Sequence, residues 1–177
     1  GTIAAAEVRA AFREQIGALL EGGVDLLILE TFGDLAEMIE AVQAARETGD
    51  LPIVAQMTFA EDGRTPMGQS PEDVVAALAP LGGAAIGANC SVGPQGVLRA
   101  AERLAAAARA YPDLRVSAQP NAGWPTRAAD RIIYQATPDY FAAHVARFLA
   151  AGVDLIGGCC GTTPEHIRAM RAALPAA

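Results

Sequence analysis

Cysteine, clustered basic residues and long apolar runs are all scarce in this sequence. Three cysteines among 177 residues are an odd count and too few for a disulfide scaffold. The formal net charge is −7, and no basic cluster suits a nucleic-acid backbone. No apolar run approaches the ~20 residues needed to cross a bilayer, and the N-terminus lacks the layout of a signal peptide. We therefore expect a cytoplasmic protein without membrane or nucleic-acid partners.

Three segments of the sequence share one pattern, namely a helix end, a glycine and a short apolar run. They are Leu19–Phe32, Leu78–Cys90 and Phe148–Cys160. Glycine just past a helix adopts a left-handed C-cap at little cost, and continuous apolar runs are typical of parallel strands buried on both faces. Leu51–Phe59 and Leu114–Asn121 fit the same strand role.

Helices are predicted between these strands. Three begin with Ser or Thr, then Pro and an acidic residue, at Ser70, Thr137 and Thr163. The hydroxyl caps the free amides, and Pro suits the first helical position. A fourth helix is predicted over Gly96–Ala110, whereas residues 123–138 are expected to form a loop. A helix followed by five β-α units predicts an α/β fold with a parallel sheet.

Two architectures fit this order, an open doubly wound sheet and a (β/α)8 TIM barrel. No Gly-x-Gly-x-x-Gly follows a strand, which disfavours a nucleotide-binding open sheet. Polar residues at the carboxyl ends of successive strands favour the barrel, which gathers those ends into one mouth. These residues are Glu30, Thr31, Thr58, Asn89, Cys90, Gln119, Asn121, Cys159 and Cys160.

The barrel interpretation implies an incomplete domain. A full barrel typically takes about 250 residues and eight strands, whereas this sequence predicts five strands. We therefore expect residues 1–177 to form a single domain, the C-terminal part of a barrel, with about three β-α units missing before Gly1.

The three cysteines are candidates for one metal site. Cys90 ends one predicted strand, and the adjacent Cys159 and Cys160 end another two units later. Catalytic zinc typically takes three protein ligands, thiolates among them, and keeps a fourth position open. Flanking glycines let the backbone bend so that both adjacent sulfurs face one ion. Inert core thiols and a strained redox disulfide are the alternatives at this point.

Two motifs, "GANC" at Gly87–Cys90 and "GGCCGTTPEHI" at Gly157–Ile167, resemble the zinc-dependent homocysteine S-methyltransferase family. The similarity extends to Leu26–Val42, Met57–Val74 and Gln119–Pro125, in order along nearly the whole chain. It points to the homocysteine-binding barrel of bacterial methionine synthases and of bifunctional proteins that pair this barrel with methylenetetrahydrofolate reductase. The family's early "DGAxGT"-like segment, which helps to bind homocysteine, has no counterpart here.

The resemblance implies a (β/α)8 barrel in which Cys90, Cys159 and Cys160 hold Zn2+ and a methyl group passes to the zinc-bound thiolate of homocysteine, forming methionine. Glu30 matches the carboxylate that binds the amino group of homocysteine, and its alternative role is that of a solvated or helix-capping acid. Asn89 meets the substrate, orients a strand end or is only a turn residue. Asn121 fills the fourth zinc position before homocysteine arrives, or stabilises its loop.

Gly158, with Gly161, is expected to shape the cysteine turn and the pocket for the substrate carboxylate. His144 and His166 are not expected to be ligands. The methyl donor stays open among methylfolate, a cobalamin-bound methyl group, betaine and S-methylmethionine, and the implied partner is a fused or separate reductase or folate domain.

Two other functions compete with methyl transfer. One is a non-catalytic zinc-binding or docking remnant of such a barrel. The other is a thiol-redox protein that uses Cys159 and Cys160, which is disfavoured because neither a basic neighbour nor Cys-x-x-Cys spacing accompanies them.

Overall fold

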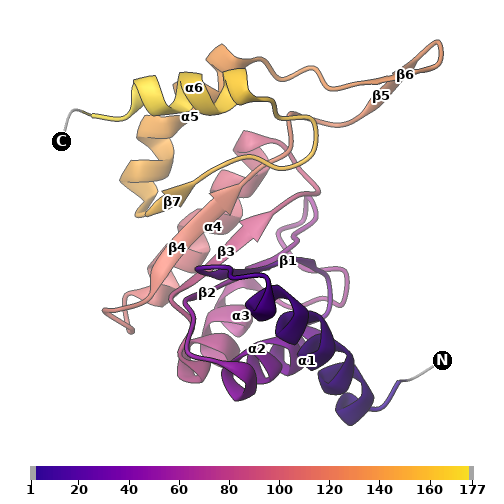
Figure 1. Ribbon diagram of the computed structural model, residues 1–177. Helices are drawn as coiled ribbons and strands as arrows, with labels where there is room; N and C mark the ends of the chain where they lie inside the picture. Colours follow the sequence, from indigo (N-terminus) through magenta and orange to yellow (C-terminus); the bar gives the residue numbers. More distant parts are fainter. Residues whose placement is uncertain (1–2, 176–177) are drawn as a thin grey trace.

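The computed structural model describes residues 3–175, which are built around one parallel sheet (Figure 1). Its strands are β1 (Leu27–Phe32), β2 (Ile53–Met57), β3 (Ala85–Asn89), β4 (Arg115–Gln119) and β7 (Leu155–Ile156). Neighbours in the sheet follow the order of the sequence, β1-β2-β3-β4-β7. The predicted α/β class and parallel sheet are confirmed. The sheet is open in the described residues, with β1 and β7 at its edges.

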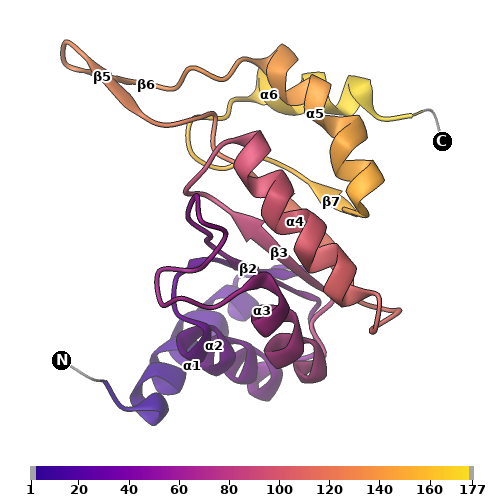
Figure 2. The ribbon, with the colours of Figure 1, turned by 180° about the vertical axis from the view of Figure 1, so that it is seen from behind.

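Six helices accompany the sheet within the described part of the chain. They are α1 (Ala5–Glu21), α2 (Leu35–Thr48), α3 (Pro71–Leu78), α4 (Pro94–Ala108), α5 (Pro138–Ala151) and α6 (Pro164–Ala173), with a short 3-10 turn η1 (Ala79–Leu81) after α3. Each helix packs against the next in the sequence (Figures 1 and 2). A doubly wound sheet reverses its strand order and carries helices on both faces, so this arrangement argues against it.

The helix ends follow the predicted chemistry. The side chains of Ser70 and Thr137 accept hydrogen bonds from the backbone N–H of Asp73 and Tyr140. Gly82 and Gly152 end the turns before β3 and β7 with φ of 79° and 90°, the left-handed region that glycine tolerates. These local signals place each following strand. In the described residues no helix is both long and apolar enough to cross a membrane.

The two faces of the sheet differ because successive side chains of a strand point to opposite sides. One face, with residues such as Ile53, Ile86 and Val116, packs against the helices in the main apolar core. The opposite face is here called the inner face, and the strand register places its residues side by side on neighbouring strands. Its residues include Ile28, Gln56, Gly87, Ser117 and Leu155.

The middle of the inner face is tightly packed. Gln56 Nε2 donates to Ser117 Oγ at 2.7 Å, and Gly87 lies between these residues in the register. A Cβ on Gly87 would lie 2.7 Å from Ser117 Cβ and still closer to the Ser117 carbonyl oxygen. The close approach of β3 and β4 therefore requires glycine at position 87.

One prediction about secondary structure is wrong. Residues 123–138, expected to form a loop, contain an antiparallel hairpin of β5 (Thr126–Ala128) and β6 (Arg131–Ile133). The hairpin projects from the body of the molecule (Figures 1 and 2), and Ile132 is 70% exposed. Its turn uses Ala129 at φ 52° instead of glycine, so the usual hairpin signal is absent from the sequence.

Candidate metal centre

The structure brings the three thiols together at the carboxyl ends of the strands. Cys90 directly follows β3, and Cys159 and Cys160 follow β7. Their sulfurs all lie within 4.8 Å of one another, and Cys160 Sγ is 3.8 Å from Cys90 Sγ and 4.0 Å from Cys159 Sγ. Tetrahedral zinc with Zn–S bonds of about 2.3 Å separates its sulfurs by about 3.8 Å. The spacing therefore fits such an ion.

Two glycines fix the turn that carries the cysteine pair. A Cβ on Gly158 would lie 2.6 Å from Thr162 Cγ2 and Oγ1. Gly161 has φ 78°, and a Cβ there would lie 2.5 Å from Cδ1 and Cδ2 of Tyr134. Thr162 closes the turn, since its Oγ1 donates to the Cys159 carbonyl oxygen at 2.7 Å. The motif needs both glycines for steric reasons.

Asn121 stabilises this turn from the end of β4. Its side chain is buried, and its Oδ1 accepts a hydrogen bond from the Cys160 backbone N–H at 3.1 Å. The Cys159 N–H is bonded at 2.8 Å to the carbonyl oxygen of Pro120. The contact between Asn121 and Cys160 is consistent with a loop-stabilising role for Asn121, and a role in the fourth zinc position stays a prediction.

Asn89 connects the thiols to the end of β1. It is 1% exposed, and its Oδ1 accepts from the Thr31 backbone N–H at 2.8 Å. Its Nδ2 donates to Thr31 Oγ1 at 2.7 Å and lies 3.5 Å from Glu30 Oε2 and 3.7 Å from Cys159 Sγ. Asn89 therefore holds Thr31 at its left-handed φ of 66° and sets the spacing between the carboxylate and the thiols.

Glu30 is exposed in the carboxyl-terminal half of β1. No basic side chain lies within salt-bridge distance of it in the described residues. Its carboxylate is therefore available to a positively charged group of a ligand.

The electrostatics of the cluster favour a cation. Burial raises the pKa of the Cys159 thiol to about 12, and the nearby Cys90 and Cys160 add to this rise, because three thiolates at such distances repel one another. A bound metal ion offsets that repulsion and deprotonates its thiol ligands. The donor set and its spacing both suit a thiophilic ion such as Zn2+.

Metal binding is accordingly expected to strengthen steeply with pH. The raised pKa keeps Cys159 protonated at neutral pH in the metal-free protein, so a metal ion must displace protons, and its affinity rises as pH approaches that pKa. We expect about three protons to be released per ion. Calorimetric titration with Zn2+ in buffers of different ionisation enthalpy measures this number. An affinity that does not change with pH would contradict thiolate ligation.

Tyr134, which directly follows β6, lies with its ring against Gly161 of the cysteine turn. Desolvation raises the pKa of Tyr134, and the nearby cysteines add to the rise. His166 anchors the segment after β6. Its Nδ1 accepts from the Thr163 N–H, which leaves Nε2 to donate to the Ala136 carbonyl oxygen at 3.0 Å. His144 Nδ1 lies 2.8 Å from the Tyr140 carbonyl oxygen, within α5.

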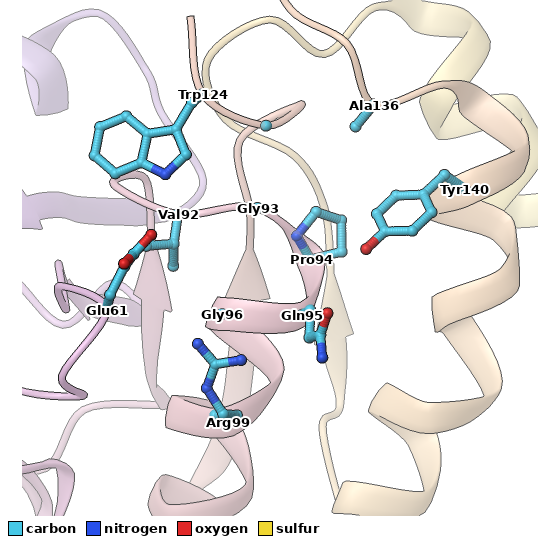
Figure 3. Close-up of a pocket in the computed structure, with 11 residues that line it drawn as sticks. Glu61, Val92, Gly93, Pro94, Gln95, Gly96, Arg99, Trp124, Ala136 and Tyr140 are labelled. Atoms are coloured by element: carbon cyan, nitrogen blue, oxygen red, sulfur yellow. The ribbon is translucent and has the colours of Figure 1, made fainter.

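A shallow groove of about 260 Å3 opens beside these loops (Figure 3). Val92 and Gly93, just after Cys90, line it together with Trp124, which extends from the Asn121 loop. In the close-up Trp124 lies over Glu61, and Arg99 reaches up from α4 below them. The exposed Trp124 ring provides an apolar surface beside the loops that follow β3 and β4.

Comparisons with known proteins identify the family of this chain. The family model described as homocysteine S-methyltransferase matches residues 1–174. The methionine synthases of Mycobacterium tuberculosis and Mycobacterium leprae are each 36% identical, over 96% and 94% of this chain but only 14% of their own length.

The structure is similar to crystal structures of the homocysteine methyltransferase MmuM from Escherichia coli. The metallated form has a TM-score of 0.78 and 27% identity, covering 97% of this chain and 53% of that one. The apo form has a TM-score of 0.78 and 26% identity, covering 98% of this chain and 58% of that one. The chain thus spans little more than half of MmuM. Because the family model matches nearly its whole length, the chain belongs to the homocysteine S-methyltransferase family.

Proposed function

We propose that this chain is the zinc- and homocysteine-binding part of an enzyme that transfers a methyl group to the zinc-bound thiolate of homocysteine, forming methionine. The observation that carries the proposal is the convergence of Cys90, Cys159 and Cys160 within 4.8 Å in a chain of this family. When bound, Zn2+ keeps sulfur ligands deprotonated and positions a thiolate nucleophile.

The residues around the thiols have separate tasks in this proposal. Three thiolates leave the fourth position of a tetrahedral site for the substrate sulfur. Glu30 binds the substrate ammonium group by a charge-assisted hydrogen bond. Asn89 contacts both Glu30 and Cys159, so it fixes the distance over which an amino acid with a thiol is recognised. Gly158, next to Cys159, leaves room for the substrate carboxylate.

We further infer that residues 1–177 are one domain and form the C-terminal part of a (β/α)8 barrel, with five of its eight β-α units. The sequential strand order supports this inference. On the inner face, the edge-strand residues Ile28 and Leu155 are 47% and 44% exposed. The fully buried Gln56 has no partner for its Oε1 in the described residues. Further β-α units across the inner face would cover Ile28 and Leu155. They would also offer a hydrogen-bond donor to Gln56 Oε1.

The residues of this site do not determine which methyl donor the enzyme uses. Methylfolate, a cobalamin-bound methyl group, betaine and S-methylmethionine remain the candidates. The methionine synthase relatives are about seven times longer than this chain, since it covers 14% of them, which supports a donor delivered by a fused or partner folate or reductase domain.

Metal analysis combined with zinc-edge X-ray absorption tests the proposal. We expect one zinc per chain, with a first shell that changes from three sulfurs and one lighter atom to four sulfurs when homocysteine is added. Zinc with an unchanged shell would favour the alternative function, a zinc-binding or docking remnant without turnover. Absence of zinc would contradict methyl transfer by this chain and would leave only a docking remnant without turnover.

Replacing Glu30 by glutamine is expected to weaken homocysteine binding about 10- to 100-fold, as for the loss of a hydrogen bond to a charged group. Zinc affinity should be unchanged, because Glu30 is not among the thiol ligands. Calorimetric titrations with each ligand measure both effects, and Glu37→Gln, an exposed acid in the first turn of α2, is the matched control. Equal losses of zinc and homocysteine affinity would show that Glu30 acts structurally.

A further inference from the structure

β1 contains one extra residue where it reaches the site. Its pairing with β2 shifts between Leu29 and Phe32, so that Glu30 and Thr31 together lie opposite the single residue Gln56. Regular alternation would bury Thr31 on the side of Leu29, whereas both Glu30 and Thr31 are exposed. Such a β-bulge changes the direction of a side chain, and bulges are frequent beside active sites.

Thr31 carries the backbone strain of this bulge. Its φ is 66°, a value that a β-branched residue rarely adopts. Glycine would adopt the same conformation without a steric penalty. Strain of this kind persists only where the surrounding structure fixes it, and it is concentrated at functional sites. A threonine at this position therefore indicates that its side chain has a task that glycine could not perform.

The contact with Asn89 identifies that task. Asn89 Oδ1 accepts a hydrogen bond from the Thr31 N–H at 2.8 Å, and Asn89 Nδ2 donates to Thr31 Oγ1 at 2.7 Å. Asn89 is itself 1% exposed, and its Nδ2 also lies 3.5 Å from Glu30 Oε2 and 3.7 Å from Cys159 Sγ. The Thr31 hydroxyl thus completes a pair of hydrogen bonds that connects the bulge to the thiol end of the site.

We propose that Thr31 is a positioning residue, which keeps the Glu30 carboxylate at the distance from the thiols that an amino acid with a thiol side chain requires. This inference rests on the proposed function, in which Glu30 binds the substrate ammonium group and the cysteines hold the metal that binds its sulfur. Thr31 acts through Asn89 and contacts no substrate atom. Without its hydroxyl the carboxylate has more freedom, so recognition of the ammonium group is weakened while binding of the sulfur is not.

Thr31→Val tests this role, because valine keeps the β-branched shape and lacks the hydroxyl. We expect homocysteine affinity to fall roughly 10-fold, as for one lost hydrogen bond. Affinity for 4-mercaptobutanoate, which has the thiol and the carboxylate of homocysteine but no amino group, should be unchanged. Calorimetric titration of the full chain loaded with Zn2+ measures both affinities. Thr31→Ser keeps the hydroxyl and should bind both thiols as wild type does.

Two further variants separate positioning from a general effect on the fold. Thr31→Gly also lacks the hydroxyl but adopts the left-handed φ without strain, so it should show the same selective loss. Thr48→Val removes a hydroxyl that donates to the Ala44 carbonyl oxygen at 2.6 Å near the end of α2. As the matched control, Thr48→Val should bind both thiols normally.

A double variant tests whether Thr31 acts through Glu30. If both residues serve one contact, Thr31→Val should cost no homocysteine affinity in a Glu30→Gln background. Wild-type homocysteine affinity in Thr31→Val and Thr31→Gly, or equal losses for the two thiols in both, would overturn the positioning role. A wild-type protein that binds neither Zn2+ nor homocysteine would instead overturn the proposed function, so the two failures are distinguishable.

Discussion

Replacing Cys160 by serine is expected to abolish stoichiometric zinc binding and to remove homocysteine binding with it. Cys160 Sγ lies within 4.0 Å of both other sulfurs, and two thiols do not make up the three protein ligands of such a site. Apparent binding energies of about 10–16 kcal/mol for structural zinc sites imply an affinity loss on the order of a thousand-fold for one ligand.

Elemental analysis after dialysis and calorimetric titration with homocysteine measure the two losses. Ser91→Ala is the control, because Ser91 follows Cys90 with the same left-handed backbone, φ 61° against 60°, but offers no sulfur. The control should retain one zinc per chain. A Cys160→Ser protein with wild-type affinity for both ligands would refute the assignment of the site.

Gly87→Ala is expected to lower the stability of the fold strongly. The new Cβ would meet the Ser117 backbone oxygen and Cβ of the neighbouring strand, and these cannot move without separating β3 from β4. Overpacking of this kind costs about 3 kcal/mol, a large part of the stability of an ordinary domain. Urea unfolding followed by circular dichroism measures the loss.

Gly17→Ala is the matched control for that experiment. Gly17 lies within α1, and a Cβ there would meet no atom within 4 Å beyond the backbone of its own helix. Alanine is the better helix former, so we expect the control to gain about 0.5–1 kcal/mol. If the two alanine variants were equally stable, the tight contact between β3 and β4 would be wrong.

The parts of the fold that depend on local chemistry could be predicted from the sequence. Gly82 and Gly152 end helical turns before apolar runs, and Ser70 and Thr137 begin helices, because caps and strand patterns involve residues close in the chain. The approach of Cys90 to the cysteine pair could also be predicted from the order of strands and helices along the chain. All three cysteines follow strands, and parallel strands present their carboxyl ends on one side.

Contacts between distant segments could not be predicted in this way. The Asn121 side chain accepts from the Cys160 backbone, and only the folded turn brings that N–H into reach. The contact of the Tyr134 ring with Gly161 depends on a hairpin whose turn has alanine where glycine or asparagine is usual. β7 is only two residues long, shorter than its apolar run indicates, although the N–H groups of Gly157 and Cys159 still donate to the carbonyl oxygens of Ala118 and Pro120 beyond it.

The thiol cluster also constrains when a metal can be acquired. Cys90 and Cys160 stand 70 positions apart, so an ion shared between them would close a long loop, as a disulfide does. Such a cross-link removes about 4 kcal/mol of chain entropy from the unfolded state. A nascent chain that ends before Cys159 offers only one of the three thiols. If the three thiols hold a metal ion as proposed, the ion can be bound fully only after the cysteine turn that follows β7 has been synthesised.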